Sequence, residues 1–179
     1  HGWSGNEVRF PGHSRQLDGI YYSIESERLD EVIREQLPER MRVTGVTVAS
    51  VTPTAVALKG HGRIRAGGVI DCRGPADTAA LDCGWQKFVG QLLELEEPHG
   101  LSKPVIMDAT VEQKDGYRFV YCLPFTPTKV FVEDTYYSDK PDLDRRTLSQ
   151  RIGAYADAQG WQVMRTLREE SGVLPVVHG

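Results

Sequence analysis

Residues 129–137, Lys129-Val-Phe-Val-Glu-Asp-Thr-Tyr-Tyr137, form the run that decides how this chain folds. β-Branched and aromatic residues of this kind favour an extended strand, whose successive side chains point to opposite faces of a sheet. We therefore expect the odd-numbered residues 131–137 on one face and the even-numbered residues 130–136 on the other. The run predicts a strand that carries one acid on each face.

The two acids, Glu133 and Asp134, are costly in such a strand, because an ionised carboxylate buried without a partner loses its solvation. Such a group persists by pairing with a cation or by keeping its proton through a raised pKa. Glu133 shares its face with aromatic residues, so it is our candidate for a proton-donating acid. Asp134 is a candidate second catalytic acid, or an anchor between the sheet and another domain. The alternative is an exposed edge strand with both acids in water.

Three neighbouring segments, 86–95, 105–113 and 117–123, also have strand patterns, and Asp115-Gly116 is a hairpin turn signal. With residues 129–137 they predict a four-stranded antiparallel sheet. A helix is predicted from about Asp144 to Gln159, followed by a strand over 161–167. The buried face of that helix is expected to consist of Leu148, Ile152, Tyr155 and Ala156.

The first half of the chain predicts smaller elements. Residues 8–24 are expected to be extended and loop-like, and residues 26–37 to form a helix with an apolar stripe of Leu29, Val32, Ile33 and Leu37. Three short strands (43–51, 55–59 and 63–65) are expected to form a meander. A short strand then leads into a glycine turn at Asp71-Cys72-Arg73-Gly74, where a nucleotide cofactor could approach.

Aromatic residues on the predicted 117–123 strand suggest a second function. Tyr117, Phe119 and Tyr121 share a face and could stabilise a cation through their rings, although core packing is the more common reason for such a pattern. Asp108 is another acid within a strand pattern, and Arg118 is its expected salt-bridge partner.

The composition excludes several classes of protein. The chain has 179 residues, 40% hydrophobic and 26% charged, with a net charge of −4, which does not resemble a basic nucleic-acid-binding surface. Three cysteines without CxxC spacing fit reduced core thiols in a cytosolic protein, and scattered histidines predict no metal site. Because the sequence starts at His1 and ends after an apolar run, we expect a piece of a longer protein.

Several strings in order along the chain resemble the bacterial lycopene β-cyclase family of flavoproteins. The N-terminal strings are Val8-Arg-Phe-Pro11, Ile70-Asp-Cys-Arg-Gly-Pro75, Gln86-Lys-Phe-Val-Gly90, Pro98-His-Gly-Leu101 and Pro104-Val-Ile-Met-Asp-Ala-Thr110. The C-terminal strings are Gly116-Tyr-Arg-Phe-Val-Tyr121, Val132-Glu-Asp-Thr-Tyr-Tyr137, Glu169-Glu170 and Gly172-Val-Leu-Pro175.

The resemblance implies an enzyme that depends on reduced FAD and closes the ψ ends of lycopene into β-ionone rings, giving γ- and then β-carotene. It implies that Glu133, the first acid of the family's strand motif, is essential, and that Asp134 matches the second acid. Phe119, Tyr121 and Phe131 are the expected substrate contacts, and residues 71–74 the expected flavin contacts. Lycopene dissolves in membranes, so the complete enzyme is expected in the cytoplasm, peripheral to the inner membrane.

The predicted fold class is α+β: part of a Rossmann-like flavin domain with an antiparallel-sheet substrate domain. Residues 1–84 are assigned to the FAD-binding domain, 85–160 to the substrate domain, and 161–179 to a return segment toward the FAD-binding domain. The family's GxGxxG turn and C-terminal flavin segment are missing from this sequence. We therefore expect this chain alone to lack FAD and to be inactive.

Two alternatives stay open at this point. The first is a flavin monooxygenase or a geranylgeranyl-reductase-like oxidoreductase of the same architecture, which would transfer electrons to its substrate or to oxygen. The second is a lipid-binding module without chemistry, in which Glu133 would be dispensable.

Overall fold

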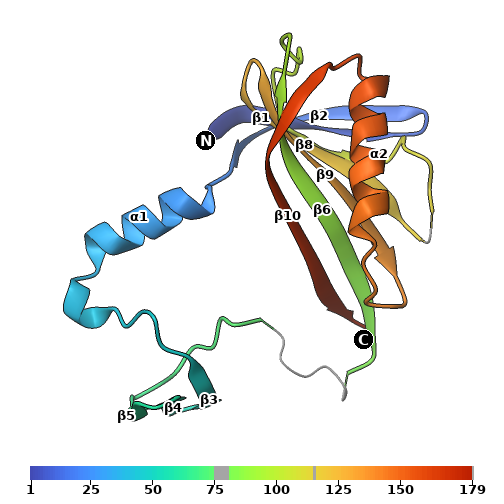
Figure 1. Cartoon of the computed structure of the whole chain (residues 1–179). Helices are drawn as coiled ribbons and strands as arrows, with labels where there is room; N and C mark the ends of the chain where they lie inside the picture. Colours follow the sequence, from blue (N-terminus) through green and yellow to red (C-terminus); the bar gives the residue numbers. More distant parts are fainter. Residues whose placement is uncertain (75–80, 115, 179) are drawn as a thin grey trace. The chain divides into compact units, whose positions relative to one another are not determined.

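A computed structural model of the chain describes residues 1–74, 81–114 and 116–178 (Figure 1). The elements in chain order are β1 (Gly2–Phe10), β2 (His13–Tyr22), α1 (Ser26–Gln36), the 3₁₀-helix η1 (Glu39–Met41), β3 (Val48–Thr52), β4 (Ala55–Leu58), β5 (Gly62–Arg65), β6 (Cys83–Leu95), β7 (Val105–Asp108), β8 (Arg118–Thr126), β9 (Lys129–Ser138), α2 (Arg145–Ala158) and β10 (Val163–Val177). They fall into two compact units, residues 1–23 with 78–179 and residues 24–77.

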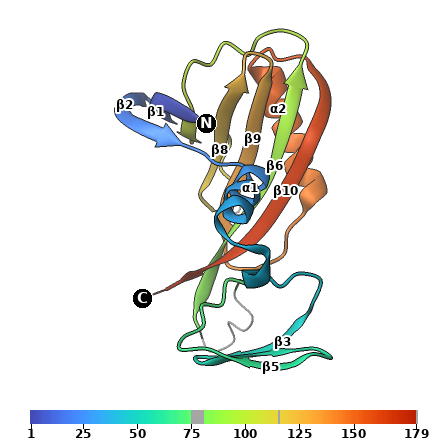
Figure 2. The same cartoon turned by 90° about the vertical axis from the view of Figure 1, so that its left-hand side faces the viewer.

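The larger unit is built on a seven-stranded sheet with the order β10-β6-β9-β8-β7-β1-β2. The predicted four antiparallel strands are confirmed as β6, β9, β8 and β7, although β7 ends at Asp108 rather than near residue 113. β9 is an interior strand, so the alternative of an exposed edge strand is wrong. Figure 2 shows β8, β9, β6 and β10 side by side, with α2 behind them.

Two further additions to the sheet were not expected. Residues 8–24 were predicted to be extended and loop-like; residues 8–22 are extended as expected, but they form the hairpin of β1 and β2, which turns at Pro11-Gly12. β1 also pairs with β7 in parallel. β10 is much longer than the predicted strand at 161–167 and pairs with β6 along its whole length. Strands from all three predicted segments therefore meet in one sheet, and the assignment of these segments to flavin and substrate domains stays a prediction.

The core lies between the sheet and α2. The predicted face of this helix is confirmed, because Leu148, Ile152, Tyr155 and Ala156 are its buried residues. They pack against valines of the interior strands, such as Val132. Asp144 caps the helix by accepting a hydrogen bond from the Thr147 backbone N–H at 3.0 Å, which satisfies one of its unpaired donors.

The smaller unit contains α1, η1 and the predicted meander, which is confirmed as the sheet β3-β4-β5. Helix α1 begins at Ser26 as expected, but Glu25 occupies the N-cap position, without a capping hydrogen bond from its side chain. The short strand predicted before Gly74 is absent, because residues 68–72 adopt no regular structure.

The observed structure confirms the coarser fold class only. The described residues are mostly sheet with two α-helices, and the larger sheet mixes antiparallel and parallel pairs. The Rossmann-like flavin domain stays a prediction. No helix among the described residues has the length and apolar character needed to cross a membrane.

A buried ion pair joins β8 to β9 beneath α2. Arg118 donates from Nη2 to Asp134 Oδ2 at 2.6 Å and from Nε to Asp134 Oδ1 at 2.9 Å. Its Nη1 donates to the Glu112 carbonyl oxygen at 2.9 Å. The Asp134 side chain is 0% exposed and that of Arg118 only 7%. The two charges are thus satisfied within the protein, and neither can recover solvation if its partner is removed.

We expect Arg118→Ala to lower the free energy of unfolding by about 3–5 kcal/mol, because it leaves the Asp134 carboxylate buried without a partner. The matched control is Arg165→Ala, which removes a 2.6 Å contact to Glu94 from a side chain that is 67% exposed and is expected to cost less than about 1 kcal/mol. Urea unfolding of both variants measures the difference. Equal costs would show that burial does not strengthen the Arg118 pair.

Candidate active site

The face of the sheet away from α2 carries Glu133. Strand register places Glu133 between Tyr121 of β8 and Gly90 of β6, and Gly90 in turn faces Glu170 of β10. The four residues form one row across four strands. Because opposed residues in a sheet point to the same side, this row brings an acid, a phenol and a second carboxylate onto one surface.

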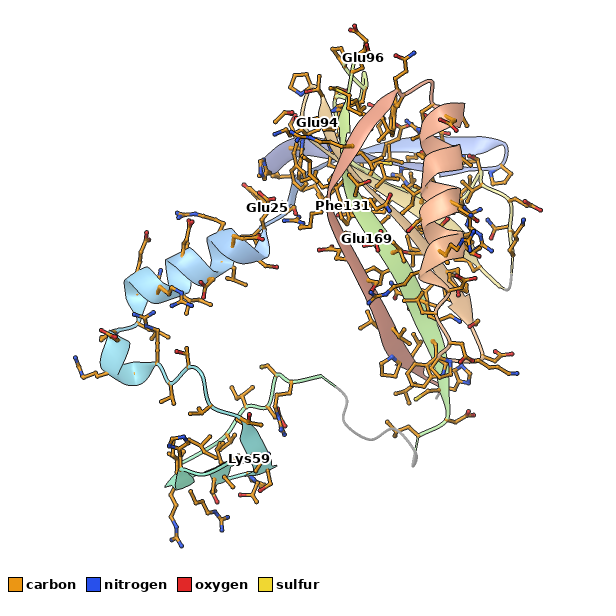
Figure 3. The ribbon with its side chains drawn as sticks, in the orientation of Figure 1. Glu25, Lys59, Glu94, Glu96, Phe131 and Glu169 are labelled. Carbon is orange, nitrogen blue, oxygen red and sulfur yellow. The ribbon has the colours of Figure 1, made fainter. Side chains whose placement is uncertain are left out.

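Gly90 makes room for an aromatic ring beside the acid. A Cβ atom at this position would lie 2.2 Å from Cζ of Phe131, so the ring occupies the space that a side chain on Gly90 would need. Phe131 is 5% exposed and is labelled in Figure 3, on the side of the sheet away from α2. The ring therefore adds apolar surface over Gly90, the register neighbour of Glu133, whose own side chain stays partly exposed.

The environment of Glu133 favours its protonated form. Burial is the main cause that raises the pKa of the Glu133 carboxyl, and the nearby carboxylates of Glu170 and Asp134 raise it further. The Thr135 hydroxyl acts in the opposite direction by donating to Glu133 Oε1 at 2.7 Å, which stabilises the ionised form. A carboxyl group held neutral in an apolar site can donate a proton.

Of the predicted substrate contacts, Phe119 and Tyr121 share this face with Phe131 and Glu133, as strand alternation predicted. Phe119 faces Thr135, two positions along β9 from Glu133. The Tyr121 hydroxyl is hydrogen-bonded to that of Tyr21, and burial raises its pKa, so this phenol stays neutral. The structure thus brings these rings around the acid, while their role in binding a substrate stays a prediction.

The predicted second acid, Asp134, points to the opposite face. Its buried ion pair with Arg118 gives Asp134 a structural role. A catalytic role for Asp134 stays a prediction. The expected pair of Asp108 with Arg118 is wrong, because the Arg118 side chain reaches diagonally across β8 and β9 to Asp134, whose register partner is Val120. Asp108 instead accepts a hydrogen bond from the Tyr155 hydroxyl at 2.9 Å and lies 3.6 Å from Arg9.

The predicted flavin contacts lie in the smaller unit. Arg73 donates from Nε and Nη2 to the two Asp71 oxygens at 2.8 and 2.7 Å, and this pairing lowers the pKa of Asp71 to about 2. Gly74 has a φ of +85°, which a residue with a side chain rarely adopts. Cys72 is an exposed free thiol rather than a core residue. Residues 71–74 are exposed, and their contact with a flavin stays a prediction.

Sequence reasoning missed four residues of this face. Trp3 and Tyr21 belong to the unexpected hairpin, and their rings lie 6.2 Å apart. The Pro11-Gly12 dipeptide was the available signal, because it marks a turn between two strands. Gly90 and Glu170 join the site only through the pairing of β10 with β6 and of β6 with β9, which no local pattern reveals.

Glu133→Gln is expected to change how stability depends on pH. The raised pKa means that the folded protein binds the proton on Glu133 more tightly than the unfolded chain does. The stabilisation that this proton gives the folded state is therefore fully present below the unfolded pKa. It is lost as pH rises through the folded pKa. The free energy of unfolding of the wild type, relative to the glutamine variant, should therefore fall across that range. Urea unfolding from pH 4 to 8 tests this, and parallel curves would contradict it.

Comparison with known proteins adds a family match. The model of the family described as lycopene cyclase protein matches residues 1–179. Proteins named lycopene beta-cyclase from Pantoea ananas and Pseudescherichia vulneris are 47% and 43% identical over 176 residues, covering 98% of this chain and 46% and 45% of those relatives. One from Paracoccus sp. (strain N81106 / MBIC 01143) is 43% identical, with 97% of this chain and 44% of the relative covered.

The chain thus spans about half the length of the curated relatives it matches. No solved structure matches it significantly.

Proposed function

The chain belongs to the lycopene cyclase family, and from that premise we propose that its full-length parent is a lycopene β-cyclase in which Glu133 is the acid. The observation that carries this proposal is the position of Glu133. It is a half-buried carboxyl on an aromatic face, and burial raises its pKa. The reaction would be an isomerisation, without net oxidation or reduction of lycopene.

The proposed chemistry begins with proton transfer. The neutral Glu133 carboxyl donates its proton to the terminal double bond of the ψ end, leaving a tertiary carbocation. A bond from a second double bond of the same end closes the six-membered ring. Loss of a ring proton then creates the ring double bond, so one proton enters and one leaves. The mass of the product equals that of lycopene.

The residues around Glu133 would stabilise the cation. The faces of Phe131 and Tyr121 offer π electrons, and each such contact contributes about 0.5–2 kcal/mol, more where water is excluded. The ionised Glu133 left after proton transfer supplies a negative charge. Asp134 supports the site from the other face by holding β8 to β9 through Arg118.

Reduced FAD is part of the proposal because the family resemblance implies it. The turn at Asp71 to Gly74 suits a cofactor contact, since it is exposed and Gly74 has no side chain to block close approach. When bound, a reduced flavin would supply negative charge near the cation. The parent enzyme would work in the cytoplasm at the surface of the inner membrane, where the apolar substrate dissolves.

The first test compares the full-length parent with its Glu133→Gln variant in cells that accumulate lycopene. We expect the wild type to form cyclic isomers of unchanged mass and the variant to lose at least about 100-fold of this activity, the usual contribution of a general acid. Chromatography with mass spectrometry measures both. Equal flavin content and yield show that the variant folds.

Other outcomes would favour other functions. Products that have gained hydrogen or oxygen would indicate the reductase or the monooxygenase. Carotenoid binding without conversion, unaffected by the substitution, would indicate the lipid-binding module. The names of the matching relatives favour the cyclase over both alternatives.

Two neighbouring substitutions should shift the pH profile of the parent enzyme in opposite directions. Glu170→Gln removes a like charge that raises the pKa of Glu133, so the alkaline limit of activity should move to lower pH. Thr135→Val removes the hydroxyl that stabilises the ionised form, so this limit should move to higher pH. The measurement is kcat/KM against pH. Shifts of the same sign in both variants would contradict this role of Glu133.

A further inference from the structure

A concave site lies at the end of the sheet where β8 turns into β9. It is a pocket of about 390 Å³ lined by Trp3, the loop of residues 98–102 and residues 124–127. Its loop contains the Pro98-His-Gly-Leu101 string, to which the proposed chemistry gives no task. Most of its walls are apolar, and it carries no Asp, Glu, Lys or Arg side chain.

The loop wall is fixed by His99, which is 8% exposed. Its Nε2 lies 2.7 Å from the Thr126 carbonyl oxygen, which can only accept, and its Nδ1 accepts from the Leu101 backbone N–H at 3.0 Å. One nitrogen donates and the other accepts, so the ring is neutral. Trp161 also donates from Nε1 to the His99 carbonyl oxygen at 3.1 Å. The wall is therefore both rigid and uncharged.

A chain of rings connects the pocket with the acid. Phe125 and Trp3 line the pocket with ring centres 6.0 Å apart, and Trp3 donates from Nε1 to the Pro124 carbonyl oxygen at 3.2 Å. Trp3 also contacts Tyr21, whose hydroxyl is hydrogen-bonded to that of Tyr121, the neighbour of Glu133. Phe125 lies four positions after Tyr121 on β8, about 13 Å along the strand.

We propose that this pocket binds the hydrocarbon chain of a polyene beyond the end that meets Glu133, and that it thereby selects long substrates. The inference rests on the proposed function. A hydrocarbon is the chemistry that fits, because the walls are uncharged and the aromatic path ends at the acid. A substrate too short to span the distance to the pocket would react without using it.

The test uses the full-length parent with two substrates. One is lycopene, and the other is an acyclic polyene with the same reacting end, cut too short to reach from Glu133 to the pocket. Ser102 lines the pocket and is exposed, so Ser102→Trp fills the space without disturbing the core. Ser14→Trp, on an exposed position of β2 outside the pocket, is the matched control.

We expect Ser102→Trp to lower kcat/KM for lycopene about tenfold, equivalent to about 1.4 kcal/mol, and to leave the short substrate unaffected. Ser14→Trp should change neither. Phe125→Leu, which shrinks one wall, should cause a smaller loss that is again confined to lycopene. If Ser102→Trp fails to fold, as judged by yield and flavin content, the kinetics of Phe125→Leu with the two substrates test the inference in its place.

Equal losses on both substrates would overturn the inference, because the pocket would then serve folding or hold another part of the longer protein. Unchanged kinetics with both substrates would overturn it as well. In either case conversion by the wild type would leave the proposed cyclase function intact. A wild type that converts neither substrate would overturn the proposed function, and the polyene site with it.

Discussion

The buried pair of Arg118 and Asp134 is the interaction on which the two faces of the sheet depend. It ties β8 to β9 in one register, and that register decides which residues meet on the opposite surface. A slip of one residue would turn every side chain of a strand to the other face. The pair therefore sets the site of Glu133 without touching it, since Tyr121 lies beside the acid only in this register.

The two acids of one strand thus have different environments and different tasks. Asp134 faces α2 and is neutralised by a cation, whereas Glu133 faces an aromatic surface where burial disfavours its charge. Glu133 and Asp134 are adjacent in sequence, and alternation along β9 places their carboxyl groups on opposite faces of the sheet. A buried ion pair and the candidate acid can therefore lie next to each other in sequence while they face opposite sides of the sheet.

Strand alternation and helical periodicity predicted much of this arrangement. The side chains of residues 130–137 lie on the expected faces, and α2 buries the expected residues. These patterns did not predict which residues contact one another across the strands of the sheet. The partner of Arg118 was wrongly taken to be Asp108, because alternation does not show which of two nearby acids a long side chain reaches, and Val120 lies opposite both Asp108 and Asp134. The β1–β2 hairpin was missed because residues 8–24 were predicted to be extended and loop-like, without strands that pair across their Pro-Gly turn.

The site residues divide in the same way. Glu133 and its aromatic neighbours on β8 and β9 follow from one hairpin, so local sequence predicts that they share a face. Gly90, Glu170 and Tyr21 come from β6, β10 and β2, and only the completed sheet brings them to the acid. Local patterns therefore placed the candidate acid Glu133 with Thr135 and its aromatic neighbours, but not with Glu170, which raises its pKa from a strand distant in sequence.

The parallel pairing of β1 with β7 has a consequence for how the protein forms. Glu7 of β1 lies beside Val105 of β7, so a strand made early must wait for one made almost a hundred residues later. Contacts between such distant segments slow folding, because a long loop must close first. During synthesis the β1–β2 hairpin would carry an unpaired edge for that time. Until β7 is made, that edge is open to pairing with other chains.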